Sequence, residues 1–204
     1  MAARFVLHHH PMSRAQRVRW LLEESGEAYE LVTHDFEAGT HKAPEFLALN
    51  PDGKLPTLLD RGPNGTWSTV VTESAAIVIH VADAAAEDGL APPPSDPARG
   101  AYLNWIVYVA AAVEPALADA VFPRAAAPPA ATIGWPPYEA AVARIAAQLA
   151  RTPYIVGERF TAADVMVGAM LQWTRSWGRL PEPKRFDGYL ARLAARPANQ
   201  KVFG

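Results

Sequence analysis

The chain has 204 residues, of which half are hydrophobic and a fifth are charged, with a formal net charge of -2 at pH 7. This length can bury a real core in one domain or two small ones, and the small net charge gives no reason to expect nucleic acid or an anionic membrane as a partner. There is no cysteine, which excludes disulfides, thiolate metal sites and catalysis by a thiol of the protein, so any sulfur chemistry must use sulfur that a ligand supplies.

The beginning of the chain predicts a βαβ unit. Residues 4–9 read as a strand and lack the apolar core of a signal peptide. Ser13 and Gln16 have the spacing of a capping box, at the start of an amphipathic helix that Gly26 ends. Residues 29–33 predict a second strand, which a right-handed connection places parallel to the first.

Two further strands and an apolar helix follow. After a loop and a short helix at 39–47, strands are expected at 56–60 and 66–71, joined by a hairpin turn at Asn64-Gly65. Residues 74–86 are almost wholly apolar, small or β-branched, which indicates a helix buried on two sides. The order β-α-β, then β-β-α, is that of a thioredoxin-like α/β domain.

A proline-rich linker divides the chain. Residues 87–97 combine polar residues with a proline run, which makes a stiff connection rather than the interior of an element. This linker separates the α/β domain at 1–86 from an all-helical domain at 98–204. No apolar run approaches the ~20 residues of a membrane helix, so we expect a cytoplasmic protein. Helices are expected at 98–118, 138–151, 161–177, 187–196 and 197–203, with Pro115 kinking or ending the first and an irregular loop at 123–137.

Two stretches carry a resemblance to a known family. Asn50-Pro51-Asp52-Gly53-Lys54-Leu55-Pro56 leads into the third strand, and Thr72-Glu73-Ser74 opens the apolar helix behind the hairpin. This pair, in that order, resembles the glutathione-binding half of the cytosolic glutathione transferases. Thr161 and Asp164 stand in a capping-box relation after Tyr154-Ile155-Val156-Gly157, which resembles the folding signature of that family's helical domain. The resemblance implies a thioredoxin-like domain followed by a helical bundle.

The resemblance also implies a glutathione-binding site. An extended tripeptide is held by strand-like pairing to exposed backbone, here that of Leu55 before a cis Pro56. A carboxylate suits the free N–H groups of a helix start, so Glu73 and Ser74 would hold the γ-glutamyl end. The residues left for the glycyl carboxylate are Lys54 and His41 or Lys42. Acidic and small polar residues also favour helix starts for their own sake, and loop lysines are often only solvated, so these alternatives stay open.

The thiol of glutathione needs a hydrogen-bond donor, because a thiol with a pKa near 8.5 is only a few per cent ionised at neutral pH. Members of the family use Tyr, Ser or Cys after the first strand, and here Phe5 occupies the usual tyrosine place. Ser13 remains, so the chain resembles the serine-type, theta- or beta-like bacterial branch. Serine is also a preferred N-cap, and one hydroxyl can accept from the helix while it donates to sulfur. His10 is a further candidate for ligand contact.

Two other groups of side chains are candidates for a binding site. The run His8-His9-His10 suggests a metal, but consecutive strand residues point to opposite faces, so no metal is expected. The second substrate is expected on the helical side, with Tyr102, Trp105 and Tyr108 as candidates. Aromatic residues at helical spacing are also what a core helix shows.

The resemblance therefore implies a homodimeric detoxification enzyme that conjugates the thiolate of bound glutathione to a small, mostly apolar electrophile. Two alternatives stay open. One is another glutathione-dependent enzyme on the same fold, such as an isomerase, an ether-cleaving lyase or a peroxidase. The other is a glutathione-binding or scaffold protein without turnover, because a fold does not fix a function.

Overall fold

The computed structural model describes residues 3–85, 89–126 and 128–204. The chain forms two compact units, Met1–Leu90 with Arg196–Gly204, and Ala91–Ala195. The last helix, expected in the domain at 98–204, thus belongs to the first unit. Residue 86 of the predicted α/β domain and residues 87 and 88 of the predicted linker lie outside the described residues.

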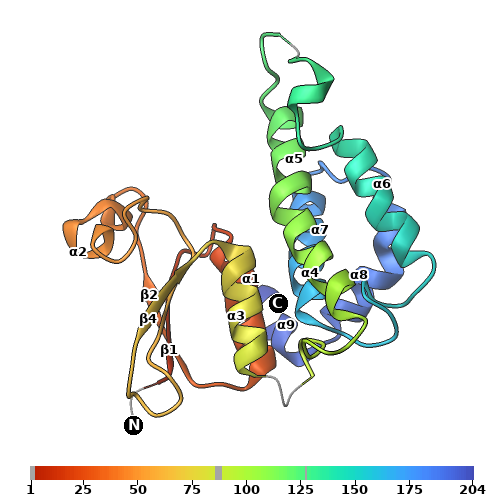
Figure 1. The fold of residues 1–204 in the computed structure, drawn as a ribbon. Helices are drawn as coiled ribbons and strands as arrows, with labels where there is room; N and C mark the ends of the chain where they lie inside the picture. The colour runs from red at the N-terminus through yellow and green to blue at the C-terminus, as the bar shows by residue number, and fades with distance from the viewer. Residues whose placement is uncertain (1–2, 86–88, 127) are drawn as a thin grey trace. The chain divides into compact units, whose positions relative to one another are not determined.

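Unit 1 is built on a mixed four-stranded sheet with the order β2-β1-β3-β4. β1 pairs parallel with β2 and antiparallel with β3, which pairs antiparallel with β4. Figure 1 shows α1 and α3 on one side of the sheet and α2 on the other. The thioredoxin-like order is therefore confirmed. The bounds are β1 Phe5–His9, α1 Ala15–Ser25, β2 Tyr29–Thr33, α2 Pro44–Leu47, β3 Thr57–Asp60, β4 Thr69–Thr72 and α3 Ser74–Ala84.

The start of α1 differs from the predicted capping box. The helix begins at Ala15, and within the described part of the chain the buried carboxamide Oε1 of Gln16 has no hydrogen-bond partner. Ser13 instead accepts a hydrogen bond from the backbone N–H of Ala15 through its hydroxyl oxygen (3.2 Å). The other end is as predicted, because Gly26 closes the helix in the left-handed region, with φ 67°.

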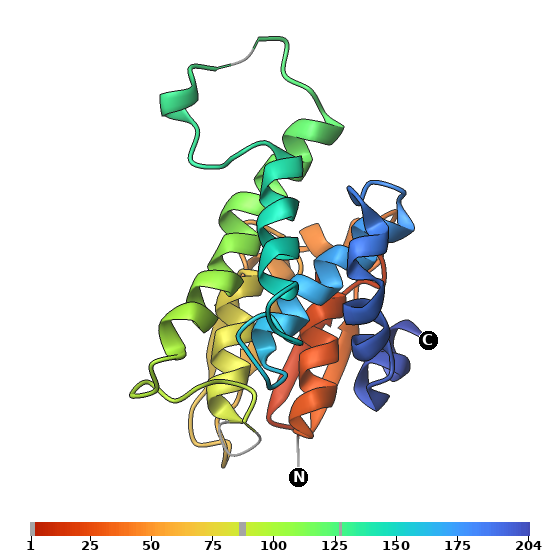
Figure 2. The same cartoon turned by 90° about the vertical axis from the view of Figure 1, so that its right-hand side faces the viewer.

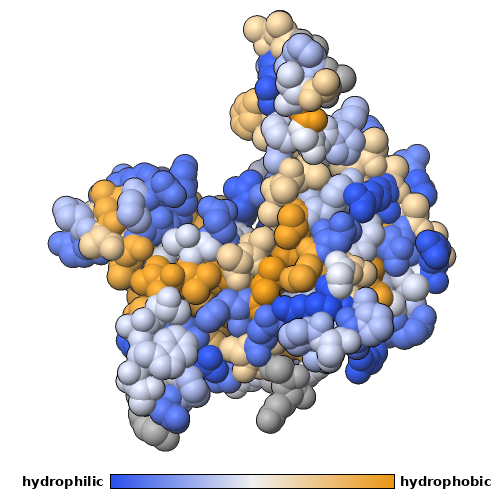
Figure 3. All heavy atoms as spheres, in the orientation of Figure 1, coloured by the Kyte–Doolittle hydropathy of each residue, from blue (hydrophilic) through white to orange (hydrophobic). Residues whose placement is uncertain are grey.

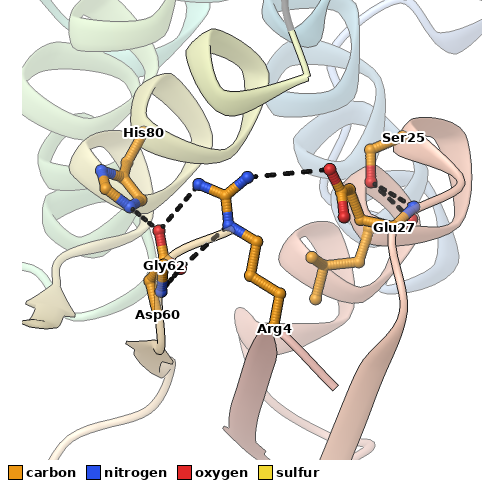
Figure 4. A network of polar contacts seen from close by, with 7 residues as sticks. Arg4, Ser25, Glu27, Asp60, Gly62 and His80 are labelled. Atoms are coloured by element: carbon orange, nitrogen blue, oxygen red, sulfur yellow. Dashed lines mark hydrogen bonds and ion pairs between the residues drawn. The ribbon is translucent and has the colours of Figure 1, made fainter. Parts of the chain in front are cut away.

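A buried carboxylate joins β1, β3 and α3 at one end of the sheet (Figure 4). Asp60 is fully buried and accepts two hydrogen bonds from the Arg4 guanidinium, at 3.0 and 3.2 Å. It also accepts one from the backbone N–H of Gly62 and lies 2.8 Å from Nε2 of His80 on α3. Burial alone raises the pKa of Asp60, but these hydrogen bonds outweigh it and hold the pKa below its ordinary value. These contacts hold α3 against this end of the sheet.

The other face of this sheet is partly open. Val32 of β2 and Val70 of β4 point to the side opposite α1 and α3, and each is more than a third exposed. Apolar side chains gather over the strands of unit 1 in Figure 3. On the same face, His8 of β1 contacts the ring of Phe46 from α2.

The C-terminal helix α9 (Pro197–Phe203) packs against α1. The ring of Phe203 meets the fully buried ring of Trp20 edge-on, at 5.9 Å between centroids. Arg196, just before α9, makes two hydrogen bonds of 2.7 Å to the carboxylate of Glu24. These contacts place the end of the chain in unit 1.

Unit 2 is all-helical, with α4 Arg99–Tyr108, α5 Glu114–Val121, α6 Tyr138–Leu149, α7 Ala162–Ser176 and α8 Asp187–Ala194. α4 and α5 are joined without a break by a π-helical turn at Val109–Val113. Proline cannot donate to the preceding turn and clashes with its carbonyl, so the turn before Pro115 widens. The helix therefore runs past the predicted end at 118.

The continuous helix from Arg99 to Val121 is long and apolar enough to cross a membrane by length and composition. A core helix passes the same test, and this one contacts α7 and α6. Tyr102, Ile106 and Val109 along it are fully buried. We therefore assign it to the core of unit 2.

The predicted cap of α7 is confirmed. Thr161 and Asp164 form a reciprocal capping box, in which the carboxylate accepts from the backbone N–H of Thr161 (2.9 Å). The carboxylate of Asp164 also accepts from the backbone N–H of Ile155 (2.8 Å) and from the hydroxyl of Tyr189 (2.9 Å). Its burial is complete and raises its pKa to about 6.

Between α5 and α6 the chain loops away from the other helices of unit 2 (Figure 2). Within the described part of this loop, residues 130–132 form a short 3-10 turn and Phe122 at its start is 77% exposed. Asp119 ties both ends of the loop to α5, because it accepts from Arg124 and from the indole N–H of Trp135.

Candidate functional site

The segment that leads into β3 presents an unpaired peptide. The Leu55–Pro56 bond is cis, as predicted. Among the described residues, the backbone of Leu55 makes no hydrogen bond to the protein. Its N–H and C=O are therefore available to an added extended peptide. Lys54, one residue earlier, is exposed.

The side chain of Asn50 fixes the segment that leads into β3. Its side chain is buried and donates to the carbonyl of Lys54 (3.0 Å) and to the hydroxyl of Thr57 (2.9 Å). The Thr57 hydroxyl in turn donates to the same Lys54 carbonyl (3.1 Å). The residues on both sides of Leu55 and Pro56 are thus fixed by one closed set of hydrogen bonds.

The start of α3 lies at the end of β4 and has an unusual backbone. Glu73 occupies the N-cap position with φ 67° and ψ 122°, a conformation that costs a non-glycine residue about 1–3 kcal/mol. Ser74 follows at the first helical position and is buried. The first turn of an eleven-residue helix offers free N–H groups and a favourable dipole to a carboxylate.

A basic loop is held next to the turn before β3. The Nζ of Lys42 donates to the backbone carbonyl of Asp52 (2.8 Å). Gly53, with φ 57°, is packed so closely that a Cβ there would lie 2.7 Å from this Nζ and 2.8 Å from the carbonyl oxygen of His41. The Nδ1 of His41 is buried and has no hydrogen-bond partner among the residues that the structure describes. The loop that carries His41 and Lys42 therefore touches the segment that carries Lys54.

The hydroxyl of Ser13 is engaged at the start of α1. It donates to the carbonyl of His10 (2.7 Å) and accepts from Ala15. The His10 ring accepts from the backbone N–H of Met12 (3.0 Å) and stacks on Phe36, with centroids 4.1 Å apart. A serine hydroxyl has one proton, so donation to a sulfur atom requires the Ser13 hydroxyl to turn from the His10 carbonyl.

The comparisons with known proteins identify this arrangement. The family model "Glutathione S-transferase, N-terminal domain" matches residues 3–83, and "Glutathione S-transferase, C-terminal domain" matches residues 82–195. The chain belongs to the glutathione S-transferase family. It is 30% identical over 203 residues to glutathione S-transferase 3 of Zea mays, covering 91% of this chain and 86% of the maize protein.

The chain is also similar to two proteins with other names. The disulfide-bond oxidoreductase YfcG of Escherichia coli (strain K12) is 26% identical over 197 residues, covering 92% of this chain and 89% of that protein. The solved structure of glutathione transferase URE2P6 from Phanerochaete chrysosporium, in complex with oxidized glutathione, matches with a TM-score of 0.78 and 26% identity. It covers 99% of this chain and 96% of that protein.

The aromatic residues expected to contact a second substrate lie in unit 2. Tyr102 is fully buried and Trp105 is 7% exposed, so both belong to the core of unit 2. Tyr108 is partly exposed, and the guanidinium of Arg144 lies 4.1 Å from its ring centroid and 5.2 Å from that of Trp105. A role in second-substrate contact remains a prediction for Tyr108.

Sequence reasoning missed the residues that hold the site together. Asn50 and Gly53 were read only as part of a turn, although an Asn-Pro-Asp-Gly run is a signal for backbone fixed by side chains. No sequence signal indicated that His34, whose Nδ1 lies 3.3 Å from the hydroxyl of Thr40, contacts the loop that carries His41. In the part of the chain that the structure describes, no group of three or more His, Asp or Glu side chains is placed to hold a metal ion.

Proposed function

We propose that the protein is a serine-type glutathione transferase that joins the thiolate of bound glutathione to a small, mostly apolar electrophile. The observation that carries the proposal is the open peptide of Leu55 before a cis proline, in one unit with the N-terminus of α3. The first pairs with the extended tripeptide, and the second holds its γ-glutamyl carboxylate through Glu73 and Ser74. Membership of the family supports this reading.

In the proposed reaction, Lys54, His41 and Lys42 supply positive charge and hydrogen bonds to the glycyl carboxylate. The Ser13 hydroxyl turns to donate to the glutathione sulfur, which favours its ionised form. The thiol proton leaves to solvent, the sulfur lone pair forms the new S–C bond, and the leaving group departs from the electrophilic carbon with its bonding electrons. The serine is not consumed.

The test is the variant Ser13→Ala, assayed with glutathione and a model aryl halide. We expect kcat/KM to fall about 10- to 100-fold, because one hydrogen-bond donor to a developing anion is lost. The affinity for glutathione, measured by calorimetry, should stay within about threefold, because the carboxylate contacts remain. Unchanged transfer with glutathione still bound would exclude the Ser13 mechanism and favour a scaffold role.

A second candidate activity is glutathione-dependent disulfide reduction. It is favoured by similarity to YfcG, a disulfide-bond oxidoreductase, and to URE2P6, solved with oxidized glutathione. This chain has no cysteine, so both thiols must come from glutathione. Two glutathione molecules would reduce one substrate disulfide to two thiols and leave as oxidised glutathione. Product analysis with an aryl halide, a small disulfide, a β-aryl ether and a hydroperoxide separates these activities.

We further propose that the protein is cytoplasmic and homodimeric, with α3 contributing to the interface. In support, exposed Ala76 and partly exposed Ala75 and Ile79 leave an apolar side of α3 outside the core of unit 1. Sedimentation velocity at micromolar concentration measures the mass directly. Ala76→Glu should shift a dimer toward monomer, and a monomeric wild-type protein would exclude the proposed assembly.

A further inference from the structure

Three consecutive histidines, the last two residues of β1 and His10 after it, each contact the end of β2 or the segment that follows it. His8 and His34 share a hydrogen bond of 3.0 Å between Nδ1 and Nε2. His9, on the opposite face, lies 3.1 Å from the hydroxyl of Thr33 through its Nε2. His10 stacks on Phe36. The histidine run therefore fastens the end of β2 to the end of β1.

Of these three contacts, the one made by His8 continues toward the proposed glutathione site. Nδ1 of His34 lies 3.3 Å from the hydroxyl of Thr40. The same hydroxyl accepts from the backbone N–H of Asp35 (2.8 Å), and the Thr40 N–H donates back to the Asp35 carbonyl (3.0 Å). Thr40 opens the 3-10 turn Thr40–Lys42. The chain of contacts thus ends one residue before His41.

Ring packing reinforces this chain. The rings of His8, His34 and Phe46 form a triangle, with centroids 5.3, 5.1 and 4.5 Å apart. His34 and Phe46 are both buried. Phe46 belongs to α2, so the triangle anchors both ends of the segment from His34 to α2 on the sheet. The basic turn lies between these two anchors.

The hydrogen bond between His8 and His34 requires at least one neutral ring, because one ring nitrogen must donate and the other accept. Burial, with the neighbouring His34, lowers the pKa of His8 to about 4. Burial also lowers the pKa of His34; a hydrogen bond of its ring with the Thr40 backbone raises this pKa, and the neighbouring His41 lowers it. Both rings are therefore neutral at pH 7.

We propose that His8 and His34 are positioning residues for glutathione binding, which act through Thr40 to hold His41 and Lys42 where they meet the glycyl carboxylate. The inference rests on the proposed function, because it takes this turn as the carboxylate site. Lys42 is held from the other side by the Asp52 carbonyl and Gly53. The histidine chain supplies the anchor on the β2 side. Neither histidine is proposed to contact glutathione itself.

The first test compares His34→Phe, which keeps a ring on Phe46 but removes both hydrogen bonds, with Thr40→Val and the double variant. We expect each single variant to weaken glutathione binding about 3- to 10-fold, the equivalent of roughly one net hydrogen bond. The kcat with saturating glutathione should stay within about twofold, so the effect appears in KM. The double variant should be no weaker than either single one, because both break one chain. Additive losses would overturn the inference.

His9→Gln is the matched control. His9 follows His8 on β1 and also contacts the end of β2, but its side chain lies on the face of the sheet away from the turn Thr40–Lys42. We expect its affinity for glutathione to stay within about twofold of wild type, even if stability falls. A loss as large as that of His34→Phe would show general loosening of unit 1 and would overturn a specific positioning role.

A second readout needs no glutathione. The backbone N–H groups of Lys42 and Ala43 donate to Gly39 and Thr40 (2.8 and 3.2 Å), so hydrogen exchange reports the order of the turn. We expect faster exchange of both in His34→Phe and no change in His9→Gln. Unchanged exchange in His34→Phe would overturn the inference. If wild type fails to bind glutathione, the proposed function fails while exchange still decides the anchor. If the wild type and His34→Phe bind glutathione with equal affinity, only the positioning role fails.

Discussion

At the scale of single residues, Asn50 fixes the backbone of the candidate site although it is not proposed to touch the ligand. It is buried and satisfies the carbonyl of Lys54 and the hydroxyl of Thr57. Asn50→Ala removes the donor to the Thr57 hydroxyl and one of the two donors to the Lys54 carbonyl, and we expect the free energy of unfolding to fall by about 1–3 kcal/mol. Glutathione affinity should fall with it, because the Leu55 peptide loses its fixed orientation. Urea unfolding and calorimetry measure the two effects.

Thr57→Val is the control for that variant. It removes one hydroxyl but keeps the bond from Asn50 to Lys54, so the loss of stability should be smaller. Equal losses in the two variants would mean that the Lys54 carbonyl is not what Asn50 fixes.

The histidines of β1 give stability a specific pH dependence. Burial lowers the pKa of His8 from 6.5 to about 4, so the unfolded chain binds its proton more tightly than the folded protein. Stability is therefore full above pH 6.5 and falls as the pH drops toward 4. His8 is only partly buried and solvent screens part of the effect, so we expect a loss of about 1–2 kcal/mol from this residue. Urea unfolding at pH 7 and 4.5 measures it, and His8→Gln should flatten the dependence.

How far the site follows from the sequence depends on how local each contact is. Short runs of residues in a characteristic order along the chain predicted the cis bond before Pro56 and the position of Glu73 and Ser74 at the start of a helix. His34 lies 26 residues from His8, and no periodicity or motif encodes that contact. Ser13 was placed at the start of a helix, but its hydroxyl proton goes to the His10 carbonyl, a turn detail that the capping pattern does not specify.

At the scale of elements, the cap of α7 shows which sequence patterns fix structure. Thr161 and Asp164 predict the box by spacing alone, and the structure adds the N–H of Ile155 and the hydroxyl of Tyr189 as further donors to the same carboxylate. The end of the first helix of unit 2 was predicted less well. Pro115 was expected to kink or end it, but a π-helical turn absorbs the proline and the helix continues.

The α7 cap leads to a prediction for unit 2. Asp164→Ala leaves the buried N–H groups of Ile155 and Thr161 without acceptors, and we expect a loss of about 3–5 kcal/mol in unfolding free energy. Tyr189→Phe removes only one hydrogen bond to the carboxylate and should cost about 1 kcal/mol. Chemical denaturation followed by circular dichroism compares them. A loss for Asp164→Ala no larger than that for Tyr189→Phe would show that the backbone bonds to this carboxylate contribute little.

At the scale of the whole molecule, the chain leaves unit 1 at Leu90 and returns to it at Arg196. The composition indicated a proline-rich linker, but nothing in the sequence indicated that the chain returns to unit 1, because α9 resembles one more amphipathic helix after α8. Its place is decided by partners on α1, namely Glu23, Glu24 and Trp20. Unit 1 is therefore not a continuous stretch of sequence, and its stability depends on residues after position 195.

Deletion of residues 196–204 tests this dependence. Without them the Trp20 ring loses its cover by Phe203, and the carboxylate of Glu24, which is 7% exposed, keeps the Trp20 indole N–H but loses its arginine. We expect unit 1 to lose about 2–4 kcal/mol, mainly because the Trp20 ring loses its apolar cover, with a smaller contribution from the partly exposed ion pair. Hydrogen exchange should accelerate in α1 and in the strands while the amides of α7 keep their protection. Lys201→Ala, which breaks a pair with a 64% exposed lysine, should leave stability close to that of the wild-type protein. Equal exchange of α1 with and without the last nine residues would mean that α9 only rests on unit 1 and does not hold it.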